Sequence, residues 1–187
     1  LPCSAPDDLE IVNELSQKYD NVYSLLGVHP NDVVKWDDSL IEKIKNFISG
    51  NKKVVGIGEI GLDYHYSKDN KDAQKNCFIN QIEIARMLNL PVVVHDREAH
   101  KDTFDILQST KVKNVLLHCF SGSVEFMKQC CMQGYKIALG GVVTFKNAIE
   151  PKEVARAVDL ADLMLETDCP YLAPHPFRGV ENAPKYI

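Results

Sequence analysis

Residues 54–64 read VVGIGEIGLDY, a run rich in apolar residues and glycines, with the carboxylate of Glu59 near its centre. Such a run is typical of a parallel strand whose two faces are both covered. Four further apolar runs are followed directly by a polar residue: YSLLGV by His29, LPVVV by His95, NVLL by His118 and LMLET by Asp168. Because (β/α)8 barrels gather their functional residues at the carboxyl ends of the strands, this recurrence predicts such a barrel.

The rest of the chain supports an α/β fold. Apolar runs begin near residues 22, 53, 91, 114, 135 and 162, and helical signals lie between them. Residues 7–18 and 72–89 have apolar side chains at helical spacing, Ser123 is suited to cap a helix through Cys131, and Pro151 suits the first turn of another. A doubly wound sheet is the alternative. We favour the barrel because ligand-type residues follow consecutive strands and do not meet at one switch point.

The length of the chain limits the barrel. Six predicted strands are fewer than eight, and such barrels typically run to about 250 residues, whereas this chain has 187. We therefore expect a partial (β/α)8 barrel, a single domain over residues 1–187, that lacks the first strand and the C-terminal helices. The missing strand should leave an open sheet edge beside the strand that precedes His29.

The composition narrows the function classes. Hydrophobic residues make up 45% and charged residues 25% of the chain, which is ordinary for a globular protein. The formal net charge of -5 argues against a protein that coats nucleic acid by neutralising phosphates. No run approaches the roughly 18 apolar residues of a membrane span, and we expect no signal peptide, no membrane association and no obligate protein partner. Six cysteines without a C-x-x-C pair predict reduced thiols in a cytoplasmic protein.

The polar residues at the strand ends form a candidate metal site. Imidazoles combined with carboxylates suit Zn²⁺ or another divalent ion. The glycines near Glu59 are expected to leave room for a metal or a substrate, and Asp63 is expected in a loop or behind the ligands. Each residue also has an ordinary alternative: an ion pair for Glu59, a buried structural role for His95, and a turn cap for Asp168.

Strand alternation makes a further prediction about two cysteines. If His118 and Asp168 face the site, then Cys119 and Cys169 point the other way and are buried as small apolar residues. They would then be neither metal ligands nor nucleophiles.

Two more residues are predicted to contact substrate. His29 lies in GVHPND, and we expect it to contact the substrate or transition state in preference to a metal. Arg97 comes two residues after His95, and its guanidinium is suited to bidentate binding of a phosphate. The ordinary alternative for Arg97 is an ion pair with Glu98 or Asp102.

Six segments in order resemble the TatD family of metal-dependent deoxyribonucleases: GVHP, VVGIGEIGLDY, LPVVVHDREAHKD, LLHCFSGS, GGVVTFKNA and LETDCPYLAPHPFRG. The resemblance runs from about residue 20 to the last residue and implies an amidohydrolase-like barrel that cleaves phosphodiester bonds in DNA. It places four residues on the family's metal ligands: Glu59, His95, His118 and Asp168. His29 and Arg97 match site positions outside that set.

The resemblance implies a nuclease with one or two divalent ions, Zn²⁺, Mn²⁺ or Mg²⁺. Asp168 would accept the proton of the attacking water, and Glu59 would bridge the metals. Two departures stand out: the family's first-strand H-x-H pair is absent, and Ala183 replaces the acidic residue of its Asn-Glu-Pro segment. The alternatives are an amidohydrolase-like metalloenzyme acting on a small molecule and a catalytically inactive binding domain, which the absent H-x-H favours.

Overall fold

The computed structural model describes residues 1–3, 5–66 and 68–187, which divide into two compact units, Leu1–Val115 and Leu116–Ile187. Six strands alternate with helices along the chain, and each strand begins within two residues of its predicted position. The assignment of both units to one domain stays a prediction.

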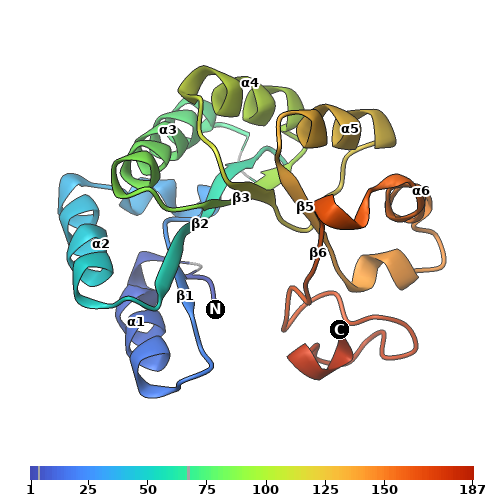
Figure 1. Cartoon of the computed structure of the whole chain (residues 1–187), viewed down its shortest axis with the longest axis horizontal. Coiled ribbons are helices and arrows are strands. Elements are labelled where there is room, and N and C mark those ends of the chain that lie inside the picture. Colours follow the sequence, from blue (N-terminus) through green and yellow to red (C-terminus); the bar gives the residue numbers. More distant parts are fainter. Residues whose placement is uncertain (4, 67) are drawn as a thin grey trace. The chain divides into compact units, whose positions relative to one another are not determined.

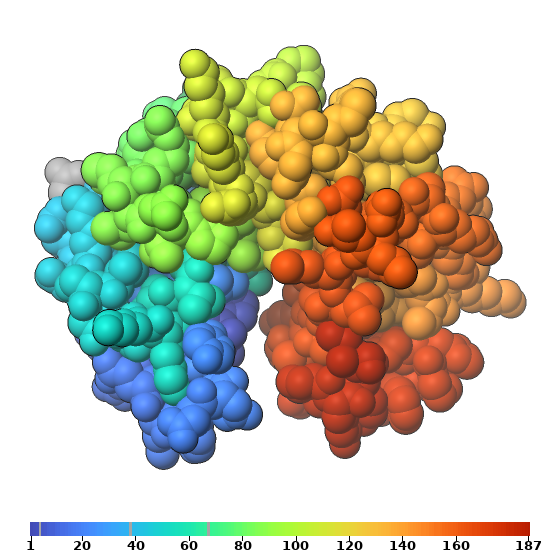
Figure 2. Space-filling model, in the orientation of Figure 1, coloured from blue at the N-terminus to red at the C-terminus, as the bar shows by residue number. Residues whose placement is uncertain are grey.

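The first unit contains three parallel strands in sequence order, with helices packed against them (Figure 1). The strands are β1 (Ser24–Leu26), β2 (Val54–Asp63) and β3 (Val92–Arg97). The helices are α1 (Leu9–Lys18), α2 (Asp38–Gly50), α3 (Lys71–Leu88) and α4 (His100–Thr110), and 3-10 turns cover Pro6–Asp8 and Pro30–Lys35. Helix α1 contacts β1, and α3 contacts β2. The space-filling view shows these segments closely packed, from the blue N-terminal residues to the green of α3 (Figure 2).

Helix α3 is the best predicted element of this unit. Its apolar face buries Phe78, Ile82 and Ala85 completely, because residues at this spacing fall on one side of a helix. The helix ends at Asn89, which adopts the left-handed conformation with a φ of 53°. Pro91 then cannot continue the helix and leads into β3.

The glycines of β2 bring β3 close and do not make room for a ligand. A Cβ on Gly61, whose φ is +142°, would clash with the carbonyl oxygen of His95. A Cβ on Gly58 would lie 2.9 Å from the Cβ of Val93. The prediction that these glycines open space beside Glu59 was wrong, because their missing side chains face the neighbouring strands.

The edge beside β1 is occupied by the N-terminal residues. The N–H of Leu25 donates to the carbonyl of Leu1 at 3.0 Å, and the N–H of Cys3 donates to the carbonyl of Leu25 at 2.9 Å. Pro2 pairs with Leu25 in the parallel direction. The expectation of an open edge beside this strand was therefore wrong.

The second unit also contains parallel strands in sequence order. They are β4 (Val115–Leu117), which begins one residue before the unit, β5 (Lys136–Leu139) and β6 (Leu163–Leu165). The helices are α5 (Val124–Met132) and α6 (Ile149–Ala157), and 3-10 turns cover Gly141–Thr144, Leu160–Asp162 and Pro184–Tyr186. The hydroxyl of Ser123 caps α5 by accepting the N–H of Phe126 at 3.2 Å, as predicted. Neither unit reverses its strand order, so neither contains the switch point of a doubly wound sheet.

Strand β6 differs from the other strands in its exposure. Met164 is 50% and Leu165 is 68% exposed, although the apolar sequence predicts a strand covered on both faces. The structure contains no disulfide among the six cysteines, and the reduced state of their thiols stays a prediction. Within the described residues, no helix has both the length and the hydropathy to cross a bilayer.

Candidate metal centre

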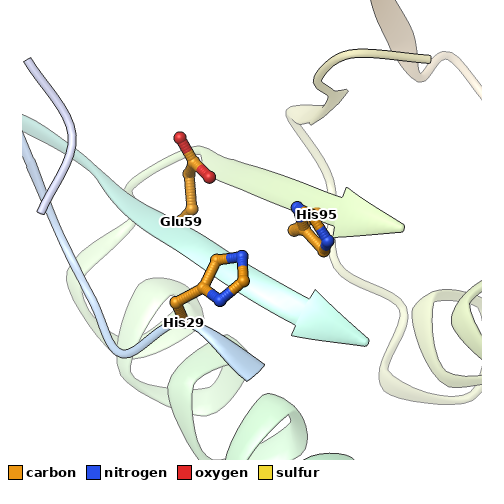
Figure 3. A group of neighbouring side chains, drawn as sticks. All are labelled: His29, Glu59 and His95. Atoms are coloured by element: carbon orange, nitrogen blue, oxygen red, sulfur yellow. The ribbon is translucent and has the colours of Figure 1, made fainter. Parts of the chain in front are cut away.

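Three of the predicted site residues lie together in the first unit. One ligand-type atom from each of His29, Glu59 and His95 lies within 4.8 Å of the other two. Glu59 and His95 come from the neighbouring strands β2 and β3, and His29 comes from the segment after β1 (Figure 3). The two imidazole rings meet edge to face, with centroids 4.4 Å apart. These contacts bring a carboxylate oxygen and imidazole nitrogens together beside the strands β2 and β3.

His95 is oriented by a buried carboxylate. Its Nε2 lies 3.1 Å from Oδ2 of Asp63, whose side chain is 1% exposed. Burial acts to raise the pKa of Asp63, but the N–H of Tyr66 and the imidazole of His95 outweigh it, so the pKa lies below the usual value. An ionised Asp63 can only accept, so in a neutral His95 Nε2 is the donor and Nδ1 keeps a lone pair. A histidine held in this way by a carboxylate is suited to bind a metal through its other nitrogen.

His29 is held in the opposite tautomer. Its Nδ1 accepts the backbone N–H of Asn31 at 3.2 Å, which requires a lone pair on that atom. A neutral His29 therefore carries its proton on Nε2. The two histidines differ in chemistry: His95 has a nitrogen lone pair for a metal, whereas His29 has an N–H for an acceptor.

Two buried glutamines of α3 fix the backbone around this group. Gln81 accepts the N–H of Val28 at 2.7 Å and donates to the carbonyl of Val28 at 3.0 Å, next to His29. Gln74 binds the N–H and carbonyl of Asp63 in the same way, at 2.8 and 3.0 Å. Sequence reasoning missed both residues. The available signal was a pair of glutamines seven positions apart on the apolar side of a helix.

The other two predicted ligands belong to the second unit. His118 is 8% exposed, and its Nδ1 lies 3.6 Å from Oε2 of Glu166. The other oxygen of Glu166 accepts the N–H of Cys119 at 2.5 Å, so this carboxylate fixes the segment after β4. The convergence of Glu59, His95, His118 and Asp168 on one centre stays a prediction.

Asp168 lies in a turn tied together by one asparagine. Asp168 has a φ of 56°, and its carbonyl accepts the N–H of Tyr171 at 2.9 Å. The amide of Asn182, which is 4% exposed, donates to the carbonyls of Thr167 and Tyr171 at 2.6 and 2.7 Å. Asn182 therefore braces the backbone on both sides of Asp168.

The prediction that two cysteines are buried opposite the site was wrong. Cys169 is exposed, and Cys119 is only partly buried. Strands β4 and β6 end at residues 117 and 165, before His118 and Asp168. Strand alternation does not extend into these turns, where Cys119 and Asp168 both have positive φ.

Arg97 does not make the ordinary ion pairs considered for it. Glu98 contacts Nδ1 of His65 at 2.6 Å, and Asp102 pairs with Lys75 at 2.7 Å. Among the side chains that the structure describes, no carboxylate pairs with Arg97. Its guanidinium carbon lies 4.7 Å from the centre of the Tyr66 ring.

The sequence matches the family model described as TatD related DNase over residues 1–187. Two similar proteins are both named uncharacterized metal-dependent hydrolases: YabD of Bacillus subtilis, 44% identical over 176 residues, and YcfH of Escherichia coli K12, 41% identical over 179 residues. These matches cover 93% and 94% of this chain, and 69% and 66% of the relatives. The chain thus spans about two thirds of the length of the curated relatives it matches.

Solved structures agree with these similarities. The TatD homologue YjjV of Escherichia coli K12 matches with a TM-score of 0.93 at 30% identity, covering 99% of this chain and 72% of that one. A TatD family hydrolase of Entamoeba histolytica matches with a TM-score of 0.82 at 26% identity, covering 92% of this chain and 60% of that one. The predicted fold class, part of an α/β barrel of this type, is confirmed.

Proposed function

Because the chain belongs to the TatD-related DNase family, we propose that it hydrolyses phosphodiester bonds in DNA with one or two divalent ions, Zn²⁺, Mn²⁺ or Mg²⁺. The observation that carries this proposal is the group formed by His29, after β1, with Glu59 and His95 from the neighbouring strands β2 and β3. Relatives named metal-dependent hydrolases support the reaction class.

The donor set fits a divalent ion. Glu59 provides carboxylate oxygen, and His95 provides a nitrogen whose lone pair is fixed by the contact with Asp63. The resemblance to the family's ligand positions adds His118 and Asp168 to the proposed set. A bound ion would supply Lewis-acid polarisation of a phosphoryl oxygen and favour the deprotonation of water.

The protein's side chains would supply proton transfer, metal binding and phosphate binding. Asp168 would orient the attacking water and accept its proton, and Glu59 would hold the ions. His29 would donate its Nε2 proton in a hydrogen bond to a phosphoryl oxygen, because its Nδ1 is occupied by Asn31. Arg97 would bind a phosphate through its guanidinium.

A single-turnover nuclease assay tests the proposal. The 187-residue chain, in excess over a labelled DNA strand, is supplied separately with Zn²⁺, Mn²⁺, Mg²⁺ or a chelator. We expect cleavage only with a divalent ion, and Glu59→Gln should lower both bound metal and the cleavage rate by about 100-fold or more. Glu42→Gln, on the exposed side of α2, is the matched control.

Two outcomes would contradict the proposal. Cleavage that persists in the chelator would show that the reaction does not depend on a metal. Cleavage by Glu59→Gln at the wild-type rate would show that this carboxylate is not required. Hydrolysis of amides or lactones without any hydrolysis of DNA would instead favour an amidohydrolase-like enzyme.

A further inference from the structure

An exposed aromatic ring stacked on an arginine lies beside the candidate metal centre. Tyr66 is 68% exposed, and the guanidinium carbon of Arg97 lies 4.7 Å from the centre of its ring. The ring of His65 meets Tyr66 edge-on at 4.8 Å between centroids. Exposed aromatic faces combined with arginine are the features with which proteins bind unpaired nucleotides, since bases stack on the ring and phosphates pair with the guanidinium.

One buried carboxylate connects this ring to the metal centre. Oδ1 of Asp63 accepts the backbone N–H groups of His65 and Tyr66 at 2.9 and 3.0 Å. Oδ2 of the same side chain contacts Nε2 of His95 at 3.1 Å. The backbone of Tyr66 is therefore fixed by the group that also orients a predicted metal ligand.

The strand register places Arg97 next to Asp63, the residue that holds the backbone of Tyr66. Asp63 and Arg97 are paired in the parallel ladder of β2 and β3, and the carbonyl of Arg97 accepts the N–H of Tyr64 at 2.9 Å. Among the described side chains, no carboxylate forms a salt bridge with this guanidinium: Glu98, whose pKa the charge of Arg97 helps to lower, contacts His65, and Asp102 pairs with Lys75. Its N–H donors can therefore serve a phosphate.

We propose that Tyr66 and Arg97 form a nucleotide subsite in which a base stacks on the tyrosine ring and the adjoining phosphate binds the arginine. The proposal rests on the proposed function and specifies its substrate at this subsite. A base inside a duplex is already stacked between its neighbours, so only an unpaired or flipped-out base can use Tyr66. The subsite therefore selects a DNA strand with an unpaired base at this position.

Binding of two oligonucleotides of equal charge tests the subsite. A fluorescent strand of thymidines is compared with a strand of abasic residues by anisotropy, at low ionic strength and with a chelator so that nothing is cleaved. Stacking of one base should make the thymidine strand bind about 5- to 150-fold more tightly. Tyr66→Ala should abolish this preference, and Tyr66→Phe should keep it because the ring remains. Arg97→Ala should weaken the binding of both strands.

Tyr23→Ala is the matched control, because Tyr23 is also exposed, at 53%, but precedes β1 at the opposite end of the strand. It should leave the preference unchanged. Equal binding of the two strands by the wild-type chain, including no measurable binding of either, would overturn the subsite, as would a preference that survives in Tyr66→Ala.

The nuclease assay separates this proposal from the function it rests on. Cleavage of DNA without any preference for the base-bearing strand would overturn the subsite and leave the proposed function standing. A preference that depends on Tyr66 in a chain that cleaves no DNA would support the subsite and count against the proposed function.

Discussion

Replacing Asp63 by asparagine should weaken metal binding without unfolding the chain. The carboxylate accepts three hydrogen bonds: two backbone N–H groups at Oδ1 and Nε2 of His95 at Oδ2. Asparagine has one acceptor oxygen and one NH₂ group, so it cannot accept on both sides. If the NH₂ faces His95, it forces the imidazole to accept at Nε2 and to carry its proton on Nδ1, the atom proposed to bind metal.

The expected loss follows from comparable sites. Removing the carboxylate partner of a metal-binding histidine typically lowers metal affinity by about 10- to 100-fold, or about 1.4 to 2.7 kcal/mol. Titration calorimetry with Zn²⁺ measures this change, and urea unfolding followed by circular dichroism shows that the fold remains. Asp105→Asn, an exposed carboxylate on α4 paired with Lys101, is the control. A folded Asp63→Asn variant whose Zn²⁺ affinity stays within about twofold of wild type would refute the role of Asp63.

Two predictions concern stability. Gln81→Leu leaves the buried N–H and carbonyl of Val28 unpaired, at about 1–3 kcal/mol each, so the free energy of unfolding in urea should fall by about 2–6 kcal/mol. The control Gln17→Leu, at an exposed position, should change the free energy of unfolding little. A loss under about 1 kcal/mol for Gln81→Leu would contradict the stabilising role of the two hydrogen bonds between Gln81 and Val28. The hydrogen bond from Lys75 is the main cause of the lowered pKa of Asp102. Since the folded pKa is below the unfolded value of about 3.9, the stability that Asp102 contributes is present above about pH 4 and is lost as the pH falls through the lowered pKa. Urea unfolding between about pH 3 and 6 should show the gap between wild type and Asp102→Asn closing below pH 4, and a constant gap would exclude the linkage.

The strands and long helices could be predicted because their signals are local. Pro91 cannot continue the helix that precedes it, and Ser123 can cap only the helix that begins next to it. The apolar runs before Glu59 and His95 lie within β2 and β3 as expected, and the facing of these two residues follows from the strand.

The surroundings of the site could not be predicted, because they depend on contacts between distant segments. Strand alternation wrongly predicted that Cys169 is buried, because the turn after β6 no longer has strand geometry. The glycine at 61 serves the approach of β3, which a single sequence does not reveal. Asp63 was expected in a loop or behind the ligands, and its contact with His95 agrees with the second of these. Its hydrogen bond to the backbone N–H of Tyr66 was not predicted. The tautomer of His29 likewise depends on a backbone hydrogen bond and not on its neighbours in the apolar run.

The two glutamines of α3 require a fixed number of helical residues between them. Gln74 and Gln81 are seven residues apart, or about 10.5 Å along the helix axis. Gln81 forms hydrogen bonds with the backbone just after β1, and Gln74 forms hydrogen bonds with the last residue of β2. Deleting one residue between them would turn one side-chain amide by about 100° relative to the other, so that only one of the two could keep its backbone hydrogen bonds. Insertions and deletions should therefore be tolerated in the loops on either side of α3 but not between these positions.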